Sequence, residues 1–573
     1  MDQPNVVLPK ELRLGAPATM PQSRSYMFKQ QAALNNYNPR DTIQINLPRL
    51  QRSYLTKDSY LEFEVEFKYT TGTTAAEKVW HALMLDTPGA LGLIDRIEVY
   101  DYLGSTQLES TSGFGQLIAL LQDTCITQDE YGTHWEATSG GQTPAIVNDF
   151  ERGTIQPVLE ATVANSRFNF DRSIMRMQQP VHGEIIDNTQ WWTSENGSVT
   201  IDTTANTRTM RRRYHIPLFS FLGLLSPKYA PLHNGYTIMI TLQTAENALI
   251  SANMKYDWPA AATAGSEVTT ATAIFGSAPS FQIKTARMCC QILELGPIAE
   301  SMLLSTTGNQ PMIVTTKAYR NYNNAIPAGS ANFKLDLNIN VASLTNVLWI
   351  MRPTAFLNST KFPSLSHRQR NFLESWYFQY GSSILPQTQG ITAFKPISNN
   401  ASHPDNGSEC LIELLKARHL YNQPQKTHLF NKYNYAYDNW ADYMKTVGLA
   451  QEAAKVPDLA PCFKYVTPNT YYEHGKFACG LDLELVSGRT NEIICGMNTN
   501  GMNTAIFATF NATAAANGTP AAAITADPPT VTLADLKNSV VKSEYVEGVT
   551  MDAWCEYDAF INISPGIATT VSF

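Results

Sequence analysis

The chain has 573 residues, of which 43% are hydrophobic and only 16% are charged, and its formal net charge is −8. This acidic balance excludes a general neutraliser of nucleic-acid phosphates, because such a protein needs an excess of basic residues. Typical soluble domains contain about 25% charged residues, so the low value here is consistent with an exterior that partner subunits cover.

The N-terminal region, residues 1–40, contains several prolines and little periodicity, so we expect an extended arm rather than a domain. The first residues, MDQP, have neither the basic nor the apolar region of a signal peptide, and we expect none. No stretch approaches the roughly 20 apolar residues of a membrane-spanning helix. The eight cysteines are scattered without a CxxC motif, which is typical of reduced, buried thiols in a protein that is made inside the cell and not secreted.

Strands begin after residue 40, because apolar and polar residues alternate there with a period of two. The alternating stretches are residues 43–47, 61–68 and 97–99, and Gly104 lies where a hairpin would turn. A helix is predicted over residues 113–123. Its leucines lie on one side, at Leu117, Leu120 and Leu121.

The stretch YHIPLFSFLGLLSPKYAPLHNGYTIMITLQ, residues 214–243, predicts two strands around a compact apolar segment. We expect a buried strand over residues 216–221, an apolar knob over 223–232 and a half-buried strand over 236–242. Residues 136–208 show no clear periodicity, and strand character returns at residues 281–283.

The second half repeats this order of events, although no residue-by-residue repeat is visible. Strands are predicted over residues 333–341, 347–351, 371–380, 481–485 and 555–563, with Gly381 ending the third of them. An amphipathic helix is predicted over residues 437–455, where Pro457 stops it.

Two small-residue stretches, residues 259–273 and 512–529, lack the large apolar side chains of a core and are predicted as loops. The whole pattern predicts an all-β fold of two tandem eight-stranded jelly-roll sandwiches, with a few short helices and long loop insertions. We expect an arm over residues 1–40, a first jelly roll over 41–305 and a second over 306–573.

The chain shows no known catalytic signature: GxxxxGK[ST], GxGxxG after a strand, HExxH and GxSxG are all missing. We therefore predict no catalytic, cofactor-binding or metal-binding residue and no enzyme activity. The weak candidates are each better explained as ordinary structure. They are a metal site at His419 and His428, a nucleophile and base at Cys479 and His474, a reactive pair at Cys289 and Cys290, a cation site at Glu62, Glu64 and Glu66, and a phosphate site at Arg211, Arg212 and Arg213.

Two segments resemble a known family. The run RRRYHIPLFSFLGLLSPKYAPLHNGYTIMITLQ is similar to the late strands of the first jelly roll in double jelly-roll major capsid proteins of the adenovirus/tectivirus lineage. The run LGLIDRIEVYDYLGSTQLESTSGFGQLIALLQD also looks like that family, with a strand pair followed by a short helix. Among its members, the chain is most similar to the capsid proteins of polinton-like viruses and virophages.

This resemblance implies upright jelly rolls and pseudo-hexagonal homotrimers that tile the icosahedral shell of a double-stranded DNA virus. The implied partners are neighbouring capsomers, penton and minor capsid proteins, and an internal membrane or the genome on the inner face, without recognition of a specific nucleic-acid sequence. Loops at residues 186–208, 259–273 and 512–529 would form outward towers. The protein would belong to the virion and assemble inside the host cell.

Two other hypotheses about the function remain open. Tandem jelly rolls also occur in glycan-binding proteins and glycan amidases, in which aromatic residues stack on sugars. The candidate platforms here are Trp191 with Trp192 and Trp376 with Tyr377. A viral spike or penton protein is the third reading, but such chains usually hold a single jelly roll, whereas this chain restarts at Phe333.

Overall fold

The computed structural model describes the following residues: 22–70, 79–86, 88–125, 136–140, 182–188, 200–202, 207–217, 223, 229–256, 270–273, 277–306, 312–327, 330–354, 357–358, 364–366, 368, 370, 373–387, 389–393, 408–421, 477–485, 496–510, 530–532, 548–563 and 570–572. The predicted helix over 437–455 and the loop over 512–529 lie outside these residues.

The first half of the chain forms two antiparallel sheets. Sheet A has the strand order β11-β3-β15-β4-β10-β9, with β1 paired to β15, and sheet B has the order β2-β12-β6-β7. The strands of sheet A are β1 (Arg24–Gln31), β3 (Ser53–Thr56), β4 (Tyr60–Thr70), β9 (Thr200–Asp202), β10 (Thr207–Pro217), β11 (Tyr229–Pro231) and β15 (Ser277–Glu294). Those of sheet B are β2 (Thr42–Leu47), β6 (Ile94–Asp101), β7 (Gln107–Ser112) and β12 (Tyr236–Leu242).

The apolar residues of these two sheets face each other and form one core. Phe63, Val65 and Phe67 of β4 meet Ile238 and Ile240 of β12, and all of them are at most 1% exposed. Their alternation with polar residues places one face of each strand in this core, because successive side chains of a strand point to opposite faces. The two sheets therefore form a sandwich.

The second half forms a second sandwich of sheets D and E. Sheet D has the order β16-β25-β18-β22, with β26 on β25, and sheet E has the order β17-β23-β19-β20, with β21 on β19. Their strands are β16 (Met312–Ile326), β17 (Asn332–Asp336), β18 (Leu344–Pro353), β19 (Leu373–Tyr380), β20 (Ser383–Leu385), β21 (Ile391–Thr392), β22 (Cys479–Asp482), β23 (Thr504–Phe510), β25 (Val549–Ile563) and β26 (Thr570–Ser572).

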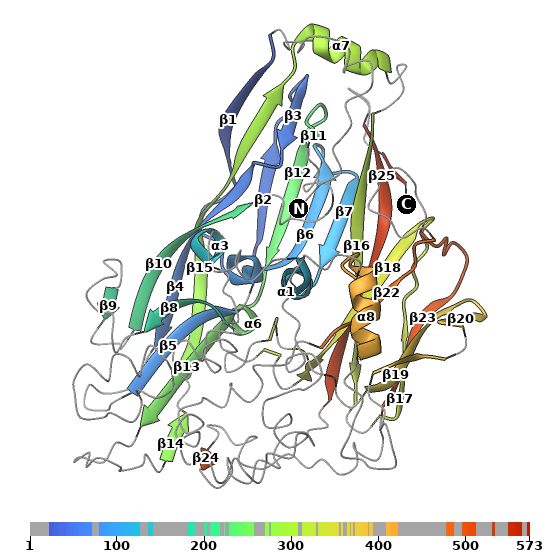
Figure 1. The fold of residues 1–573 in the computed structure, drawn as a ribbon. Coiled ribbons are helices and arrows are strands. Elements are labelled where there is room, and N and C mark those ends of the chain that lie inside the picture. The colour runs from blue at the N-terminus through green and yellow to red at the C-terminus, as the bar shows by residue number, and fades with distance from the viewer. Residues whose placement is uncertain are drawn as a thin grey trace.

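The two sandwiches share one feature of strand topology. In each, the first strand pairs antiparallel with a long late strand: β1 with β15 in the first sandwich and β16 with β25 in the second. Figure 1 shows the two groups of strands side by side, with their strands running roughly along the same direction. The repeat thus lies in the topology and not in the sequence.

A further sheet, sheet C, has the order β24-β14-β13-β5-β8. Its strands are β5 (Val79–Asp86), β8 (His182–Asn188), β13 (Leu249–Tyr256), β14 (Thr270–Ala273) and β24 (Thr530–Thr532). Because β24 comes from the second half of the chain and pairs with β14 from the first, this sheet joins the two halves.

Short helices connect the strands. The helices that the structure describes are the 3-10 helix η2 (Gly89–Leu93) and the α-helices α1 (Phe114–Cys125), α3 (Glu136–Ser139), α6 (Ala245–Ala248), α7 (Pro297–Thr306) and α8 (Ser408–Ala417). Within the described residues, none of these helices combines the length and apolar character needed to cross a membrane.

Several sequence predictions are confirmed. The strands at β2, β4, β6, β12, β18 and β19, the helix α1 and the turn at Gly104, with φ of +70°, lie where the periodicity placed them. The all-β fold with short helices is likewise confirmed. The expected arm over residues 1–40 contains a strand, β1, that extends sheet A.

Other predictions are wrong in their limits. The strand predicted at 216–221 overlaps the end of β10, which already starts at Thr207 and extends to Pro217, and residues 218–221 lie outside the described residues. The strand predicted at 333–341 ends at Asp336, although Leu337, Ile339 and Val341 remain buried. Leu485, expected on a buried face, is 84% exposed, and the end of the predicted 259–273 loop forms β14.

Candidate functional site: the seam between the sandwiches

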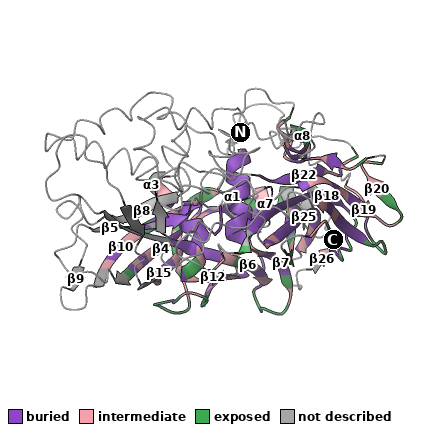
Figure 2. Ribbon diagram, turned by 90° about the horizontal axis from the view of Figure 1, so that it is seen from below, coloured by how far each residue is buried: buried purple, intermediate pink, exposed green. Residues whose placement is uncertain are grey.

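The helix α1 lies between the two sandwiches and contributes to both cores. Phe114 and Ile118 belong to the core of the first sandwich, whereas Leu117, Leu120 and Leu121 belong to the core of the second. Figure 2 shows this helix as buried along its length. Every described side chain of α1 is buried, and its apolar residues pack into both cores, so α1 fixes the two sandwiches against each other. We call this contact region the seam.

Buried polar contacts cross the seam next to α1. The Asp86 carboxylate, at the end of β5, accepts hydrogen bonds from the backbone N–H groups of Leu365 and Ser366 at 2.8 and 3.2 Å, and from the Ser366 hydroxyl. Asp123 of α1 forms an ion pair with Arg368, and both side chains are fully buried. Buried charges must be paired to avoid a large desolvation cost. The seam therefore contains matched polar contacts in addition to its apolar packing.

The late strand β25 also contacts both sandwiches. The indole Nε1 of Trp554 donates a hydrogen bond to the Ser112 carbonyl at the end of β7, at 3.2 Å. Further along the same strand, Ile561 and Ile563 are part of the first core. The two sandwiches are therefore one continuous block rather than two domains on a flexible linker.

The carboxylates that the sequence placed on one face of β4 form a charge ladder across sheet A. Glu66 accepts a hydrogen bond from Arg211 on β10 at 2.8 Å, and Glu64 pairs with Arg213 at 3.4 Å. Glu62 is only 4% exposed and accepts from Nε of Arg287 on β15 at 2.8 Å. The glutamates of β4 and the arginines Arg211 and Arg213 are therefore partners of each other, whereas Arg212 donates to the Arg211 carbonyl. The paired residues are better explained as a charge ladder than as separate cation and phosphate sites.

Glu62 should make the stability of the protein depend on acid pH. Hydrogen bonds from Arg287 are the largest cause that lowers the pKa of Glu62, from 4.5 to about 2. A carboxyl group with a lowered pKa in the folded state adds stability above its unfolded pKa, and this stability is lost as the pH falls through the folded value. We expect the melting temperatures of the wild type and Glu62→Gln to differ at pH 7 and to converge between pH 4.5 and 2. A difference that stays constant down to pH 2 would contradict this assignment.

The cysteine candidates are buried thiols. Cys290 lies in the first core and Cys289 on the opposite face, where its Sγ lies 3.8 Å from Glu62. Burial raises the pKa of Cys290 to about 12 and that of Cys479 well above its ordinary value. A nucleophilic cysteine needs the thiolate form, so these thiols are unsuited to that role. The proposed base, His474, lies outside the described residues.

The remaining candidate is the histidine pair His419 and His428, of which the structure describes only the first. His419 lies near Glu484, with 3.6 Å between its Nε2 and a carboxylate oxygen, and His428 is outside the described residues. Across the part of the chain that the structure describes, no group of three metal-ligating side chains comes together.

The structure describes one of the two aromatic platforms suggested for glycan binding. Trp376 is fully buried and meets Trp349 edge to face, with 5.3 Å between ring centroids. Tyr377, on the other face of β19, stacks on Phe507 at 4.9 Å. The prediction of a joint Trp376–Tyr377 platform is therefore wrong, because neighbouring residues of a strand point in opposite directions. Trp191 and Trp192 lie outside the described residues.

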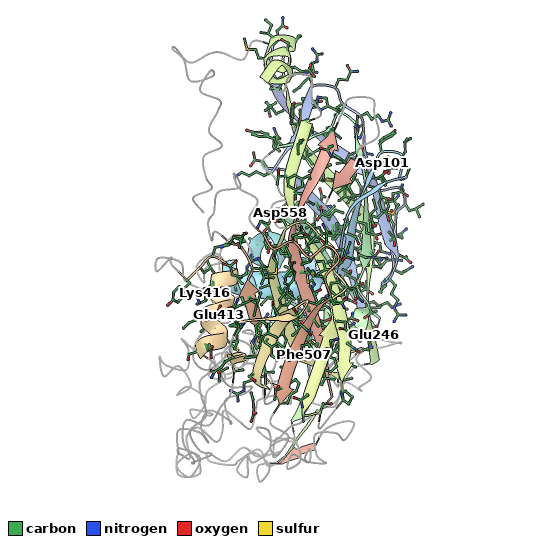
Figure 3. All side chains as sticks on the ribbon, turned by 90° about the vertical axis from the view of Figure 1, so that its right-hand side faces the viewer. Asp101, Glu246, Glu413, Lys416, Phe507 and Asp558 are labelled. Carbon is green, nitrogen blue, oxygen red and sulfur yellow. The ribbon has the colours of Figure 1, made fainter. Side chains whose placement is uncertain are left out.

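A buried polar cluster in sheet D escaped the sequence analysis. Lys317 of β16 contacts Glu484 at 2.9 Å and Asp558 at 3.9 Å, and Arg418 contacts Glu556 at 3.2 Å. Figure 3 shows Asp558 on β25, and it also shows Glu413 and Lys416 together on α8. The three acidic residues of the largely apolar β25, Asp552, Glu556 and Asp558, were the only signal in the sequence for this cluster.

No protein-family model and no curated protein matches the sequence. The structure resembles a chain from the 3.5 Å cryo-electron microscopy structure of the Sputnik virophage, with a TM-score of 0.50 and 11% identity over 99% of this chain and 92% of that chain. The crystal structure of the mavirus major capsid protein gives a TM-score of 0.46 and 10% identity, over 98% and 93%. The Faustovirus major capsid protein gives 0.44 and 10%, over 96% and 92%.

The likeness to the Sputnik virophage chain extends over nearly the whole length of both proteins, so the fold is shared in full. The sequence resemblance predicted this fold from two segments only. The chain therefore has the double jelly-roll fold, with two sandwiches joined along a buried seam.

Proposed function

We propose that this protein is a major capsid protein whose homotrimers tile the icosahedral shell of a double-stranded DNA virus. The observation that carries this proposal is the seam: α1, the Asp123–Arg368 pair and β25 hold two upright sandwiches side by side as one block. The shared fold with a chain of the Sputnik virophage supports the same role.

The geometry explains how one chain could fill a hexagonal lattice. Each block presents two similar outer walls, so three copies related by a threefold axis present six. Closed rotational symmetry of this kind needs only one repeated type of contact. A fixed angle between the walls requires the two sandwiches to be rigidly joined, which is the role we assign to the seam.

The proposal extends to the surroundings of the trimer. The two jelly rolls are residues 41–305, which β1 of the preceding arm extends, and residues 306–573. The trimer contacts neighbouring capsomers and penton and minor capsid proteins. Its inner face meets a membrane or the genome without reading a nucleic-acid sequence. The protein is a virion component that assembles in the host cell, and we assign it no reaction.

Self-association of the purified full-length chain tests the proposal. Three copies of a 63.6 kDa chain give about 191 kDa, and we expect this mass from light scattering at neutral pH and moderate salt. Negative-stain microscopy should show particles with a hexagonal outline. A monodisperse species of 63.6 kDa under these conditions would refute the trimer.

The glycan-binding hypothesis depends on aromatic platforms, and the structure removes one of them. Of the two aromatic platforms it requires, the one at Trp376 and Tyr377 is split between the core and the surface. A glycan array with the full-length chain would still reveal binding through other residues, and we expect none.

A further inference from the structure

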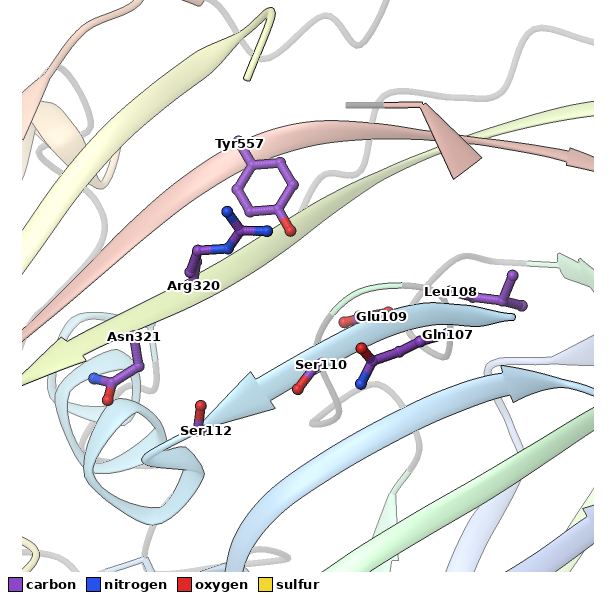
Figure 4. Close-up of a pocket in the computed structure, with 8 residues that line it drawn as sticks. All are labelled: Gln107, Leu108, Glu109, Ser110, Ser112, Arg320, Asn321 and Tyr557. Atoms are coloured by element: carbon purple, nitrogen blue, oxygen red, sulfur yellow. The ribbon is translucent and has the colours of Figure 1, made fainter. Parts of the chain in front are cut away.

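A polar pocket of about 220 Å³ lies in the seam, between β7 of the first sandwich and β16 and β25 of the second. Its walls carry Gln107, Ser110 and Ser112 from β7, Arg320 and Asn321 from β16, and Tyr557 from β25. Figure 4 shows these side chains facing one another across the space where β7 and β16 diverge. This volume is below the roughly 300 Å³ at which pockets for drug-sized ligands begin, so the pocket suits a small group.

Both strands that flank the pocket are sheet edges. β7 is the last strand in the order of sheet B, and β16 is the last strand in the order of sheet D. The outward backbone N–H and C=O groups of an edge strand are not used by the sheet ladder. Among the described strands, neither β7 nor β16 has a ladder partner on its outer side, and the pocket lies where these two edges meet.

A hydrogen bond between the two sandwiches closes one end of the pocket. The hydrogen bond from the Trp554 indole to the Ser112 carbonyl closes that end, and the Asn321 amide donates to the Ala553 carbonyl at 3.3 Å. Gly113 allows this closure, because its φ of +61° is a backbone conformation that residues with a side chain rarely adopt. The cavity is thus maintained by specific contacts between the two sandwiches.

Arg320 gives the pocket its charge. The residue is exposed, its guanidinium lies 6.0 Å from the centre of the Tyr557 ring, and among the described residues it forms no ion pair with a carboxylate. Other exposed arginines of the protein, such as Arg211 and Arg213, do have carboxylate partners. An arginine that forms no ion pair with a carboxylate among the described residues favours an anion that a planar guanidinium can hold.

Glu109 limits the kind of anion. It lines the same pocket but is 8% exposed, and its carboxylate lies against Gly223, where a Cβ would come within 1.6 Å of Oε1. A carboxylate in the wall repels a doubly charged phosphate more strongly than a singly charged carboxylate.

We propose that this pocket binds a single carboxylate group, with Arg320 as its charge partner and Tyr557 and Asn321 as neighbouring hydrogen-bonding groups. The proposal concerns the seam of each chain and does not depend on the trimer. The carboxylate can belong to a free small acid or to the glutamate side chain of another protein, and the probes below distinguish these sources.

Isothermal titration calorimetry on the full-length chain tests the proposal with three probes: acetate, N-acetyl-glutamyl-N-methylamide and inorganic phosphate. We expect both carboxylates to bind and phosphate to bind more weakly. Tighter binding of the glutamyl probe assigns the site to a protein side chain, and equal binding assigns it to a free acid. Because a hydrogen bond to a charged group is worth about 1.5–3 kcal/mol, Arg320→Gln should weaken binding by roughly tenfold or more.

The matched control is Arg49→Gln. Arg49 is also exposed and also lies over a tyrosine ring, that of Tyr102 at 4.7 Å, but it is not among the residues that line the pocket. We expect wild-type affinity in this variant and unchanged melting temperatures in both variants. Failure of both carboxylates to bind, equal losses in the two variants, or tighter binding of phosphate would each overturn the proposal.

Discussion

Replacing Arg368 with methionine is expected to lower the free energy of unfolding by about 3–5 kcal/mol, because it leaves the buried Asp123 carboxylate without its cationic partner. Both side chains of this pair are fully buried, and they join α1 to the 364–370 segment of the second half. Methionine preserves much of the apolar stem of arginine, so the loss should come mainly from the missing charge. Urea unfolding followed by far-UV circular dichroism measures the change.

Two controls separate this effect from a general loss of packing. The double variant Asp123→Leu/Arg368→Met should recover most of the stability, since replacing both buried ions by apolar residues is often neutral. Lys416→Ala, at the exposed ion pair with Glu413 on α8, should cost at most about 0.5 kcal/mol. A loss below that level for Arg368→Met would show that the ion pair does not stabilise the seam.

Replacing Trp376 with alanine is expected to cost about 3–5 kcal/mol of folding free energy, the usual range for a large aromatic side chain removed from a core. Trp376 and Trp349 are both fully buried and in edge-to-face contact between sheets E and D. Removal of either ring leaves a cavity that surrounding strands cannot close without breaking their ladders. The same urea titration measures the loss.

The neighbouring residue is the natural comparison. Tyr377→Ala removes a half-buried ring whose main partner is Phe507 on the outer face of sheet E, and an aromatic pair contributes about 0.5–1.5 kcal/mol beyond the buried area. We therefore expect a clearly smaller loss than for Trp376→Ala. Equal losses, or normal stability of Trp376→Ala combined with lost glycan binding, would favour a surface platform over a core role.

The elements that the sequence predicted well are those in which burial alternates locally. In β4 and β12, every second residue faces the core, and the period of two is visible within seven to eleven residues. The same rule failed at residues 337–341, where side chains alternate in burial although β17 ends at Asp336. The backbone N–H of Leu337 still donates to the Thr504 carbonyl of β23, but the N–H of Val341 donates to the Thr499 hydroxyl and not to a strand backbone. Alternation of apolar and polar residues indicates which side chains are buried. Whether a sheet forms depends on the presence of a partner strand.

The polar contacts could not be predicted, because their partners are far apart in the chain. Arg287 and Glu62 are separated by 225 residues, and Arg368 and Asp123 by 245. The glutamates of β4 looked like a wet face, yet Glu62 is nearly buried, since β10 and β15 place arginines on both sides of it. The pocket beside Arg320 likewise exists only where two sheet edges from different halves meet.

The sequence by itself determined that the chain is built of strands with one apolar face, arranged in two successive groups, since these properties depend on neighbouring residues. Tertiary structure alone decided that α1 belongs to both cores, that Trp376 is internal and that the two sandwiches form one block. These features depend on which distant surfaces are brought together, and the local spacing of side chains does not contain that information.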